Sequence, residues 1–478
     1  MAFELVGNPN VIEMEYAVRG PIPQRAAELR KQGRKIVPCN IGNPQALGQK
    51  PLTFYRQVLS LVEDPARIGR ERALNRMLEE GAGSRSGPLE RFPEYVLEVG
   101  ERVLAGLESG LGAYTESKGP AFIREAVARF IDQRDGVASS GGPPCDPERV
   151  FLTNGASEGA KRIIELLIAG PKDGIMIPIP QYPLYSASIR QCGGVAVGYY
   201  PDEDRGWTLE RPILDEAYQR AGAQGVRVKG IVVINPGNPT GAVLPEQSVR
   251  DVLDFAAARE LVVIADEVYQ ENTYGAEFVS FARVLGRGDL PLFSLHSVSK
   301  GFYGECGHRG GYLEVRNPPR LKGVGLGACD VLLKQASVSL CSNTVGQVLT
   351  YLLVSPPPAG SEPFALFALE KQRVLDTLLE KATMVKAAFR EMQGVECFGR
   401  IGALYLFPRL GQLPPGTTDF DYCMSLLEAT GLSTVNGSGF GQREGTQHLR
   451  IAFLPEKALL EEVLPQWVRF HNQYVARR

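Results

Sequence analysis

Seven short apolar runs, each followed by a turn, constrain the fold of this chain more than any other feature of the sequence. Several of them are apolar at consecutive positions, which is typical of strands buried on both faces of a parallel sheet. Helical patterns at 157–169 and 245–259 separate some of these runs. The runs lie at 150–153, 174–179, 195–200, 230–234, 261–265, 292–296 and 311–315. We therefore predict an α/β domain in which a mostly parallel, mixed sheet lies between helices.

The length of the chain leaves room for a second, smaller α+β domain. The 478 residues are 44% hydrophobic and 22% charged, which suits a folded protein with a substantial core. A helical pattern at 364–392 precedes short apolar runs at 403–407 and 449–454. The predicted division is an N-terminal segment with part of the small domain at 1–111, the large α/β domain at 112–330 and the C-terminal small domain at 331–478.

Charge, hydropathy and cysteine spacing argue against several classes of function. The net charge of −2 gives no basic footprint for nucleic acid or for an anionic membrane surface. No apolar run approaches the roughly 18 residues that a membrane-spanning helix needs. The eight cysteines form no C-x-x-C pair and the four histidines no H-E-x-x-H motif, so we expect no metal site. Because the first residues lack the pattern of a secretory or transit peptide, we expect a cytoplasmic protein.

Polar segments follow the predicted strands at their carboxyl ends, where open α/β sheets bind ligands. Gly155, Ala156 and Ser157 join a strand to a helix, so their N–H groups can bind a phosphate or carboxylate, although a simple N-cap serine explains Ser157 equally well. Arg309 could bind the same anion, or be a surface arginine in a glycine-rich loop. The polar segments lie at 154–159, 180–183, 235–241, 266–269 and 297–300.

Asp266 and Lys300 carry the strongest chemical signal among these residues. A carboxylate directly after the buried run 261–265 is costly without a cationic partner, which favours a functional role over a helix N-cap. Lys300 follows a predicted strand and a Ser-x-Ser turn, and burial beside Arg309 would favour the neutral amine that Schiff-base chemistry needs. A lysine for an aldehyde, a carboxylate for a ring nitrogen and an anion-binding turn together point to pyridoxal phosphate.

Four motifs resemble the signature of the fold type I aminotransferases, which use pyridoxal phosphate. They are Asn235 to Gly241 (NPGNPTG), Asp266 to Tyr269 (DEVY), Ser297 to Gly301 (SVSKG) and Gly307 to Gly311 (GHRGG). Five further motifs resemble those of alanine aminotransferases. They are Glu15 to Pro21 (EYAVRGP), Asn40 to Gln45 (NIGNPQ), Ile179 to Ser186 (IPQYPLYS), Gly304 to Gly307 (GECG) and Gly437 to Gly445 (GSGFGQREG). The resemblance extends from about Val11 to Phe470.

The resemblance implies which residues act on the cofactor ring. Lys300 would form the Schiff base with the cofactor and then move the proton between the substrate Cα and the cofactor. Asp266 would pair with the pyridinium nitrogen. Asn238 and Tyr269 would hold the ring hydroxyl, with Tyr269 counted among the catalytic residues, and Tyr182 would stack on the ring. Without the resemblance, a rigid turn explains Asn238 and plain packing explains Tyr182.

The resemblance also implies a phosphate site, a substrate site and a homodimer. The phosphate would be bound by Ala156, Ser157, Ser297, Arg309 and, from a partner subunit, Tyr114. Arg450 would bind the α-carboxylate of the substrate, in a pocket also lined by Asn238, Gly42 and Tyr16. An arginine inside an apolar run is an expensive placement without an anionic partner, which agrees with that role. Asn436 stands where we expect a proline, and we expect this departure to loosen the loop that follows.

The implied reaction converts L-alanine and 2-oxoglutarate into pyruvate and L-glutamate by a ping-pong mechanism, so the partners are small amino acids and 2-oxo acids. One alternative within the class is a glutamate–glyoxylate aminotransferase. Another class is an α/β serine hydrolase, because Ser157 lies in a G-x-S-x-G motif and Ser157, Asp266 and His308 follow the hydrolase order. That alternative leaves Lys300 and Arg309 unexplained. The S-x-x-K motif of penicillin-binding enzymes also matches at 297–300, but no K-T-G follows it.

Overall fold

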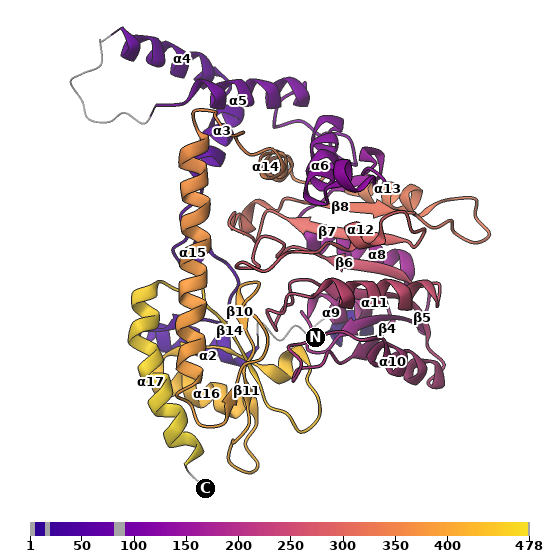
Figure 1. The fold of residues 1–478 in the computed structure, drawn as a ribbon, viewed down its shortest axis with the longest axis vertical. Helices are drawn as coiled ribbons and strands as arrows, with labels where there is room; N and C mark the ends of the chain where they lie inside the picture. Colours follow the sequence, from indigo (N-terminus) through magenta and orange to yellow (C-terminus); the bar gives the residue numbers. More distant parts are fainter. Residues whose placement is uncertain (1–4, 15–19, 81–90, 477–478) are drawn as a thin grey trace.

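The larger part of the molecule is built on a seven-stranded sheet (Figure 1). The computed structural model describes residues 5–14, 20–80 and 91–476. The sheet has the order β2-β8-β7-β6-β5-β3-β4; β8 runs antiparallel to both of its neighbours, and the other strands pair in parallel. Its strands are β2 (Val150–Leu152), β3 (Asp173–Pro178), β4 (Val195–Tyr199), β5 (Arg227–Ile234), β6 (Val262–Asp266), β7 (Leu292–Ser297) and β8 (Gly311–Arg316). The predicted mixed, mostly parallel sheet is confirmed.

Helices cover both faces of this sheet, which explains why the strands are apolar at consecutive positions. In β5, Val232 and Ile234 pack on one face, whereas Ile231 and Val233 pack on the other. The first face is covered by α8 (Ala156–Leu167), α9 (Leu184–Gln191) and α13 (Ala328–Val338). The second face is covered by α10 (Arg211–Ala223), α11 (Glu246–Ala257) and α12 (Phe281–Leu285). Burial of both faces leaves the strand ends as the place where polar side chains can gather.

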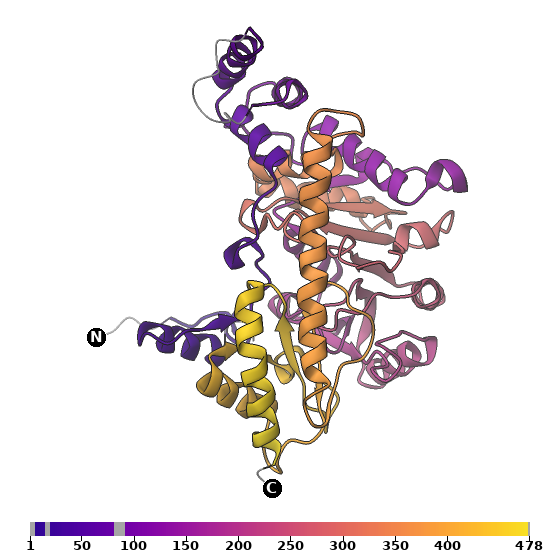
Figure 2. The same ribbon diagram turned by 60° about the vertical axis from the view of Figure 1, so that its left-hand side comes forward.

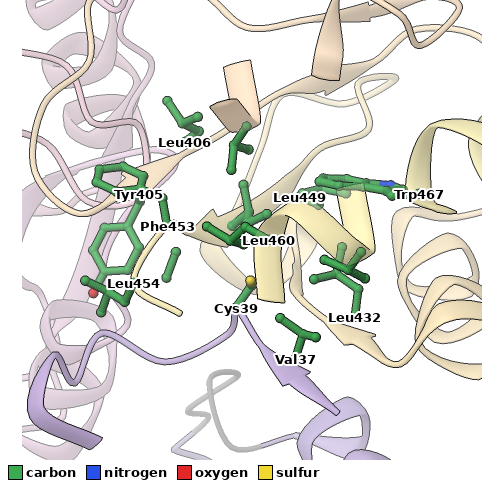
Figure 3. Packing of buried hydrophobic residues seen from close by; sticks show 14 of the residues in the cluster. Val37, Cys39, Tyr405, Leu406, Leu432, Leu449, Phe453, Leu454, Leu460 and Trp467 are labelled. Atoms are coloured by element: carbon green, nitrogen blue, oxygen red, sulfur yellow. The ribbon is translucent and has the colours of Figure 1, made fainter. Parts of the chain in front are cut away.

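A smaller α+β part combines residues from both ends of the described chain. Figure 3 shows Val37 and Cys39 packed among Leu432, Leu449 and Trp467. Its strands are β1 (Val37–Pro38), β9 (Val395–Glu396), β10 (Tyr405–Leu406), β11 (Arg409–Leu410), β12 (Leu432–Ser433), β13 (Val435–Asn436) and β14 (Leu449–Ala452). β14 lies between β10 and β13 in an antiparallel sheet, and β1 pairs with β12 in parallel. Its helices are α2 (Pro21–Lys31), α16 (Asp419–Thr430) and α17 (Lys457–Val475).

The long helix α15 (Phe364–Phe389) runs beside α17 and connects the two parts (Figure 2). A third group of helices shares one hydrophobic core next to the large sheet: α3 (Thr53–Glu63), α5 (Glu94–Leu107), α6 (Ala121–Arg134) and α14 (Thr344–Val354). The remaining elements are α1 (Pro9–Ile12), α4 (Ala66–Glu79), α7 (Val137–Ser140), and the short 3₁₀ helices at Gln45–Leu47, Pro147–Arg149, Cys306–His308 and Gly437–Phe440.

The predicted helical patterns at 157–169, 245–259 and 364–392 correspond to α8, α11 and α15. The predicted boundary between residues 330 and 331 falls inside α13, and the division into three ranges stays a prediction. In the part of the chain that the structure describes, no helix is both long and apolar enough to cross a membrane.

Candidate active site

A cavity of about 620 Å³ lies where β5, β6 and β7 end. This volume falls within the range of small-molecule sites, about 300–1,000 Å³. Most of the predicted site residues line it: Gly42, Ala156, Ser157, Tyr182, Asn238, Asp266, Tyr269, Ser297, Lys300, Arg309 and Arg450. Two predicted residues are not in this set. Tyr114 lies between α5 and α6 with 78% of its surface exposed, and Tyr16 lies outside the described residues.

Lys300 reaches the cavity from the turn that follows β7. Its Nζ donates a hydrogen bond to the carbonyl oxygen of Gly42 at 2.9 Å and lies 5.9 Å from the centre of the Tyr269 ring. Gly42 belongs to the N-terminal segment and lies 258 residues before Lys300, so a distant part of the chain positions the amine. An amine with one carbonyl partner inside a cavity is available to react with a carbonyl compound or to carry a proton.

Asp266 ends β6 and is 5% exposed. Its Oδ2 accepts a hydrogen bond from Tyr185 Oη at 2.7 Å, and its Oδ1 accepts one from the Val268 amide at 3.4 Å. Burial raises the pKa of this carboxyl, although both hydrogen bonds and the charge of Lys300 oppose the shift. No ion pair to Asp266 forms within the described residues, so its carboxylate retains the capacity to pair with a cationic ring nitrogen.

The first turn of α8 and Arg309 form an anion-binding corner of the cavity. Gly155 has a positive φ of 73° and immediately precedes Ala156 and Ser157, the first residues of the helix. A Cβ on Gly155 would lie 2.6 Å from Arg309 Nη2, so a larger residue would displace the guanidinium, and the positive φ itself favours glycine. Arg309 itself has a positive φ of 53° and donates from Nη2 to the Asn154 carbonyl at 2.9 Å. The helix N-terminus and the guanidinium together favour a phosphate at this corner.

Arg450 enters the cavity from β14 and is 2% exposed. Its Nη1 donates to Asn238 Oδ1 at 3.2 Å and its Nη2 to the Asn40 carbonyl at 2.7 Å, whereas its buried Nε has no hydrogen-bond partner among the described residues. Its guanidinium carbon lies 4.2 Å from the centre of the Tyr405 ring. Because no carboxylate of the described chain forms an ion pair with it, the buried charge is free to bind a ligand carboxylate.

Asn238 and Tyr269 link this guanidinium to the interior of the cavity. Asn238 Nδ2 lies 3.4 Å from Tyr269 Oη, within hydrogen-bond distance. Burial, reinforced by the neighbouring Tyr405, raises the pKa of Tyr269 well above its ordinary value, so its hydroxyl stays protonated and can donate. Ser297 is buried and donates to the Gly310 carbonyl at 3.1 Å.

These residues fit pyridoxal phosphate. The cavity holds an amine for the aldehyde, a buried carboxylate for the ring nitrogen and a corner suited to a phosphate, where a Cβ on Gly155 would displace the Arg309 guanidinium. The unpartnered Nε of Arg450 adds a polar atom that a bound substrate can satisfy.

Sequence reasoning missed two tyrosines of this site. Tyr185 lies in the first turn of α9, three residues after Tyr182, and its hydroxyl holds Asp266; its place in the same polar motif after a strand was the available signal. Tyr405 lines the cavity, and its Oη lies 3.5 Å from Tyr269 Oη. Burial alone would raise the pKa of Tyr405, but the charges of Lys300 and Arg450 lower it below its ordinary value.

The hydrolase alternative requires a serine, a histidine and a carboxylate in hydrogen-bonded sequence. His308 Nδ1 instead lies 2.9 Å from Glu305 Oε2, and Asp266 is bound by Tyr185. His308 is also absent from the cavity lining that holds Ser157. The structure therefore does not assemble this triad.

The loop after Asn436 is tied to the small part by a buried carboxylate. Asp419 accepts hydrogen bonds from the Ser438 amide at 2.7 Å, from Ser438 Oγ at 2.8 Å and from Gln442 Nε2 at 2.9 Å. Asn436 Nδ2 donates to Ser438 Oγ at 2.7 Å. Four hydrogen bonds therefore hold the loop at the position where we expected the missing proline to loosen it.

Comparisons with known proteins agree with this geometry. The family described as "Aminotransferase class I and II" matches residues 85–465. Glutamate–glyoxylate aminotransferase 2 of Arabidopsis thaliana is 40% identical, over 98% of this chain and 96% of its own length. Alanine aminotransferase 1 of Homo sapiens is 42% identical, over 98% of this chain and 94% of its own length.

Two solved structures share the fold of this chain. The alanine aminotransferase of Pyrococcus furiosus superposes with a TM-score of 0.76 at 24% identity, covering 98% of this chain and 100% of its own. A mutant aspartate aminotransferase of Thermus thermophilus superposes with a TM-score of 0.72 at 18% identity, with the same coverage. With its full-length match, its mixed sheet and its cavity, the chain belongs to the class I and II aminotransferases, fold type I enzymes that depend on pyridoxal phosphate.

Proposed function

We propose that this aminotransferase converts L-alanine and 2-oxoglutarate into pyruvate and L-glutamate by a ping-pong mechanism. The buried Arg450, which has no carboxylate partner in the described chain, carries the proposal because it suits the α-carboxylate that both amino acids and both oxo acids share. The 42% identity to a human alanine aminotransferase supports the choice of substrates. Tyr405 stands directly over Gly42 and beside the Arg450 guanidinium, so its ring borders the place proposed for the substrate carboxylate.

Each residue of the cavity then has a defined task. When bound, pyridoxal phosphate supplies a carbonyl group for the amino group and a ring that accepts electrons from the substrate Cα. Arg450 and Asn238 orient the substrate carboxylate. Lys300 takes the proton from the substrate Cα and returns it, since its amine is the basic group inside the cavity. Asp266 would keep a proton on the ring nitrogen, and the hydrogen bond from Tyr185 favours the charged form of this carboxylate.

The remaining predicted residues bind the other edges of the cofactor. Asn238 and Tyr269 would hold the ring hydroxyl, and Tyr182 would hold the ring. Ala156, Ser157, Ser297 and Arg309 would bind the phosphate. Gly42 lines the substrate side, together with Tyr16 in the sequence-based prediction.

The catalytic role of Lys300 is tested by Lys300→Ala, which we expect to abolish transamination because Lys300 is the one lysine among the described residues that line the cavity. Lys371→Ala is the matched control, since Lys371 pairs with Glu271 at 3.3 Å outside the cavity lining. Ester hydrolysis that survives in Lys300→Ala and disappears in Ser157→Ala would instead support a serine hydrolase.

A glutamate–glyoxylate aminotransferase is the second candidate, because the relative with this name from Arabidopsis thaliana matches the chain at 40% identity over nearly its whole length. The deciding measurement compares pyruvate and glyoxylate as acceptors with L-glutamate as the donor. We expect the larger kcat/KM for pyruvate. A kcat/KM that favours glyoxylate would replace the first candidate with the second.

We further propose a homodimer in the cytoplasm. Tyr114 supports the dimer, because it is 78% exposed and absent from the cavity of its own chain, so it can reach the phosphate site of a partner. Sedimentation should give twice the chain mass, and a fully active monomer would contradict the proposal.

A fluorescent fusion tests the proposed cytoplasmic compartment. A mitochondrial signal would contradict the cytoplasmic proposal. This outcome is the alternative to test, because the similar protein of Dictyostelium discoideum is named a probable mitochondrial alanine aminotransferase.

A further inference from the structure

A second cavity, of about 330 Å³, lies between residues 44–52, helix α15 and the link from β14 to α17. It shares no lining residue with the candidate active site. Its apolar walls are formed by Pro44, Leu47, Pro51, Leu52, Val374, Leu378 and Leu454. Figure 3 shows Leu460 beside Cys39 and Leu454 beside Tyr405 in the adjoining hydrophobic core. The cavity is thus large enough for a small organic ligand with an apolar body.

Lys381 places a buried positive charge in this cavity. The side chain is 7% exposed, and its Nζ donates a hydrogen bond to the Leu454 carbonyl at 2.6 Å. An ammonium group has three donors, and Lys381 forms no ion pair within the described residues, so two donors remain for a ligand. Burial lowers the pKa of Lys381 to about 8, although Cys39 and Glu456 oppose the shift. A bound anion would compensate this buried charge.

The rim of the cavity also favours an anion. Lys50, Arg373 and Lys457 line it together with two carboxylates, Glu370 and Glu456. Glu370 is already engaged, because its carboxylate accepts hydrogen bonds from the Thr53 amide at 3.0 Å and from Thr53 Oγ1 at 2.6 Å. These hydrogen bonds leave the charge of Glu370 in place, whereas Lys457 is already paired with Glu380 at 2.5 Å. Lys50, Arg373 and Lys381 therefore give three positive charges against two carboxylates.

We propose that this cavity binds a small aliphatic carboxylate and that its binding increases the affinity of the enzyme for its amino-acid substrate. The carboxylate would lie against Lys381. The branched hydrocarbon end would lie against Leu47, Val374 and Leu378.

Both walls of the cavity continue into the candidate active site. This continuity would couple ligand binding in the cavity to substrate binding in the active site. Residues 44–52 follow Gly42, whose carbonyl accepts the hydrogen bond from Lys300. Gln49 Nε2 donates to the carbonyl of Phe302, two residues after Lys300, at 2.9 Å. On the other wall, Leu454 lies two residues after the end of β14, the strand that carries Arg450. A ligand between these walls would stabilise residues 44–52 in the position seen here, packed against α15. In this position the preceding Gly42 binds Lys300, so the same arrangement completes the substrate site.

The binding test uses 4-methylpentanoate, which has no amino or oxo group and so cannot be transaminated, with the holoenzyme in a calorimetric titration. Lys381→Met should weaken binding about tenfold or more, because it removes a charge-assisted contact. Lys386→Met is the matched control, since Lys386 on the same helix donates to the Gly399 carbonyl at 2.7 Å outside this cavity. Equal affinity in wild type and Lys381→Met overturns the proposal, as does an absence of binding to the wild type.

A second variant covers the case in which Lys381→Met fails to fold. Leu47→Trp fills the cavity from the opposite wall and leaves Lys381 in place, and it should cause the same loss of binding. In steady-state assays, 4-methylpentanoate should lower the KM for the amino donor about fivefold in the wild type and have no such effect in either variant. A KM that rises indicates binding at Arg450 instead and overturns the proposal, and an unchanged KM overturns the coupling. Any donor and acceptor that the enzyme accepts will serve, so this test fails separately from the proposed substrates.

Discussion

Replacing Tyr185 by phenylalanine tests whether the hydroxyl of this residue keeps Asp266 charged. The ring is fully buried, and its hydroxyl donates to Asp266 Oδ2 at 2.7 Å. A hydrogen bond to a charged group contributes about 1.5–3 kcal/mol to stability. The variant leaves the carboxylate with the longer contact to the Val268 amide, at 3.4 Å. We therefore expect Tyr185→Phe to lower the free energy of unfolding of the cofactor-free protein by about 1.5–3 kcal/mol at pH 8.

The decrease in the free energy of unfolding caused by Tyr185→Phe should depend on pH in a predictable direction. Burial raises the pKa of Asp266 in the folded protein, so between the unfolded and folded pKa values the folded state binds more protons than the unfolded state. The contribution of this group to stability therefore decreases as pH rises through the folded pKa. Because Tyr185 favours the charged form, its removal raises the folded pKa further. The cost of the substitution should thus be smaller at pH 5 than at pH 8.

Tyr199→Phe is the matched control for this experiment. Tyr199 is equally buried, but its hydroxyl donates to a neutral group, the Val232 carbonyl, at 2.7 Å. Its loss should cost about 0.5–1.5 kcal/mol at either pH. Urea unfolding followed by circular dichroism at pH 5 and pH 8 measures both variants. If Tyr185→Phe costs no more than Tyr199→Phe, or costs the same at both pH values, the argument about Asp266 is wrong.

Two further predictions concern glycines of the candidate active site. Gly155→Ala should weaken the binding of pyridoxal phosphate to the cofactor-free enzyme about tenfold or more, because its Cβ would meet Arg309 at 2.6 Å on a backbone with φ of 73°. A fluorescence titration measures this affinity, and the control Gly170→Ala, whose Cβ would meet no neighbouring atom within 4 Å, should bind the cofactor normally. Gly42→Ala should reduce kcat/KM for the amino donor, because its Cβ would overlap the Tyr405 hydroxyl; adding Tyr405→Phe should recover part of the activity, and no recovery would contradict the steric explanation.

Local patterns were sufficient to predict the large sheet. A strand covered on both faces must be apolar at consecutive positions, and β5 and β6 show this pattern because helices pack on each side. The same logic located the site, since Ser297 and Asp266 end their strands at the edge where α/β sheets bind ligands. Resemblance then identified the role of Arg450, and the position of this arginine inside an apolar run agreed with an anionic ligand.

The sequence by itself determined which residue types are available at the strand ends, and these types already indicated pyridoxal phosphate chemistry. Only the tertiary structure decided which groups they meet. The Gly42 carbonyl reaches Lys300 across 258 residues, and Tyr405 reaches the cavity because β10 pairs with β14. The physical reason is that periodicity records whether a side chain is buried, whereas contacts between distant segments depend on how helices and sheets pack together. The cavity beside Lys381 also depends on packing between distant segments, because it forms where residues 44–52 meet α15.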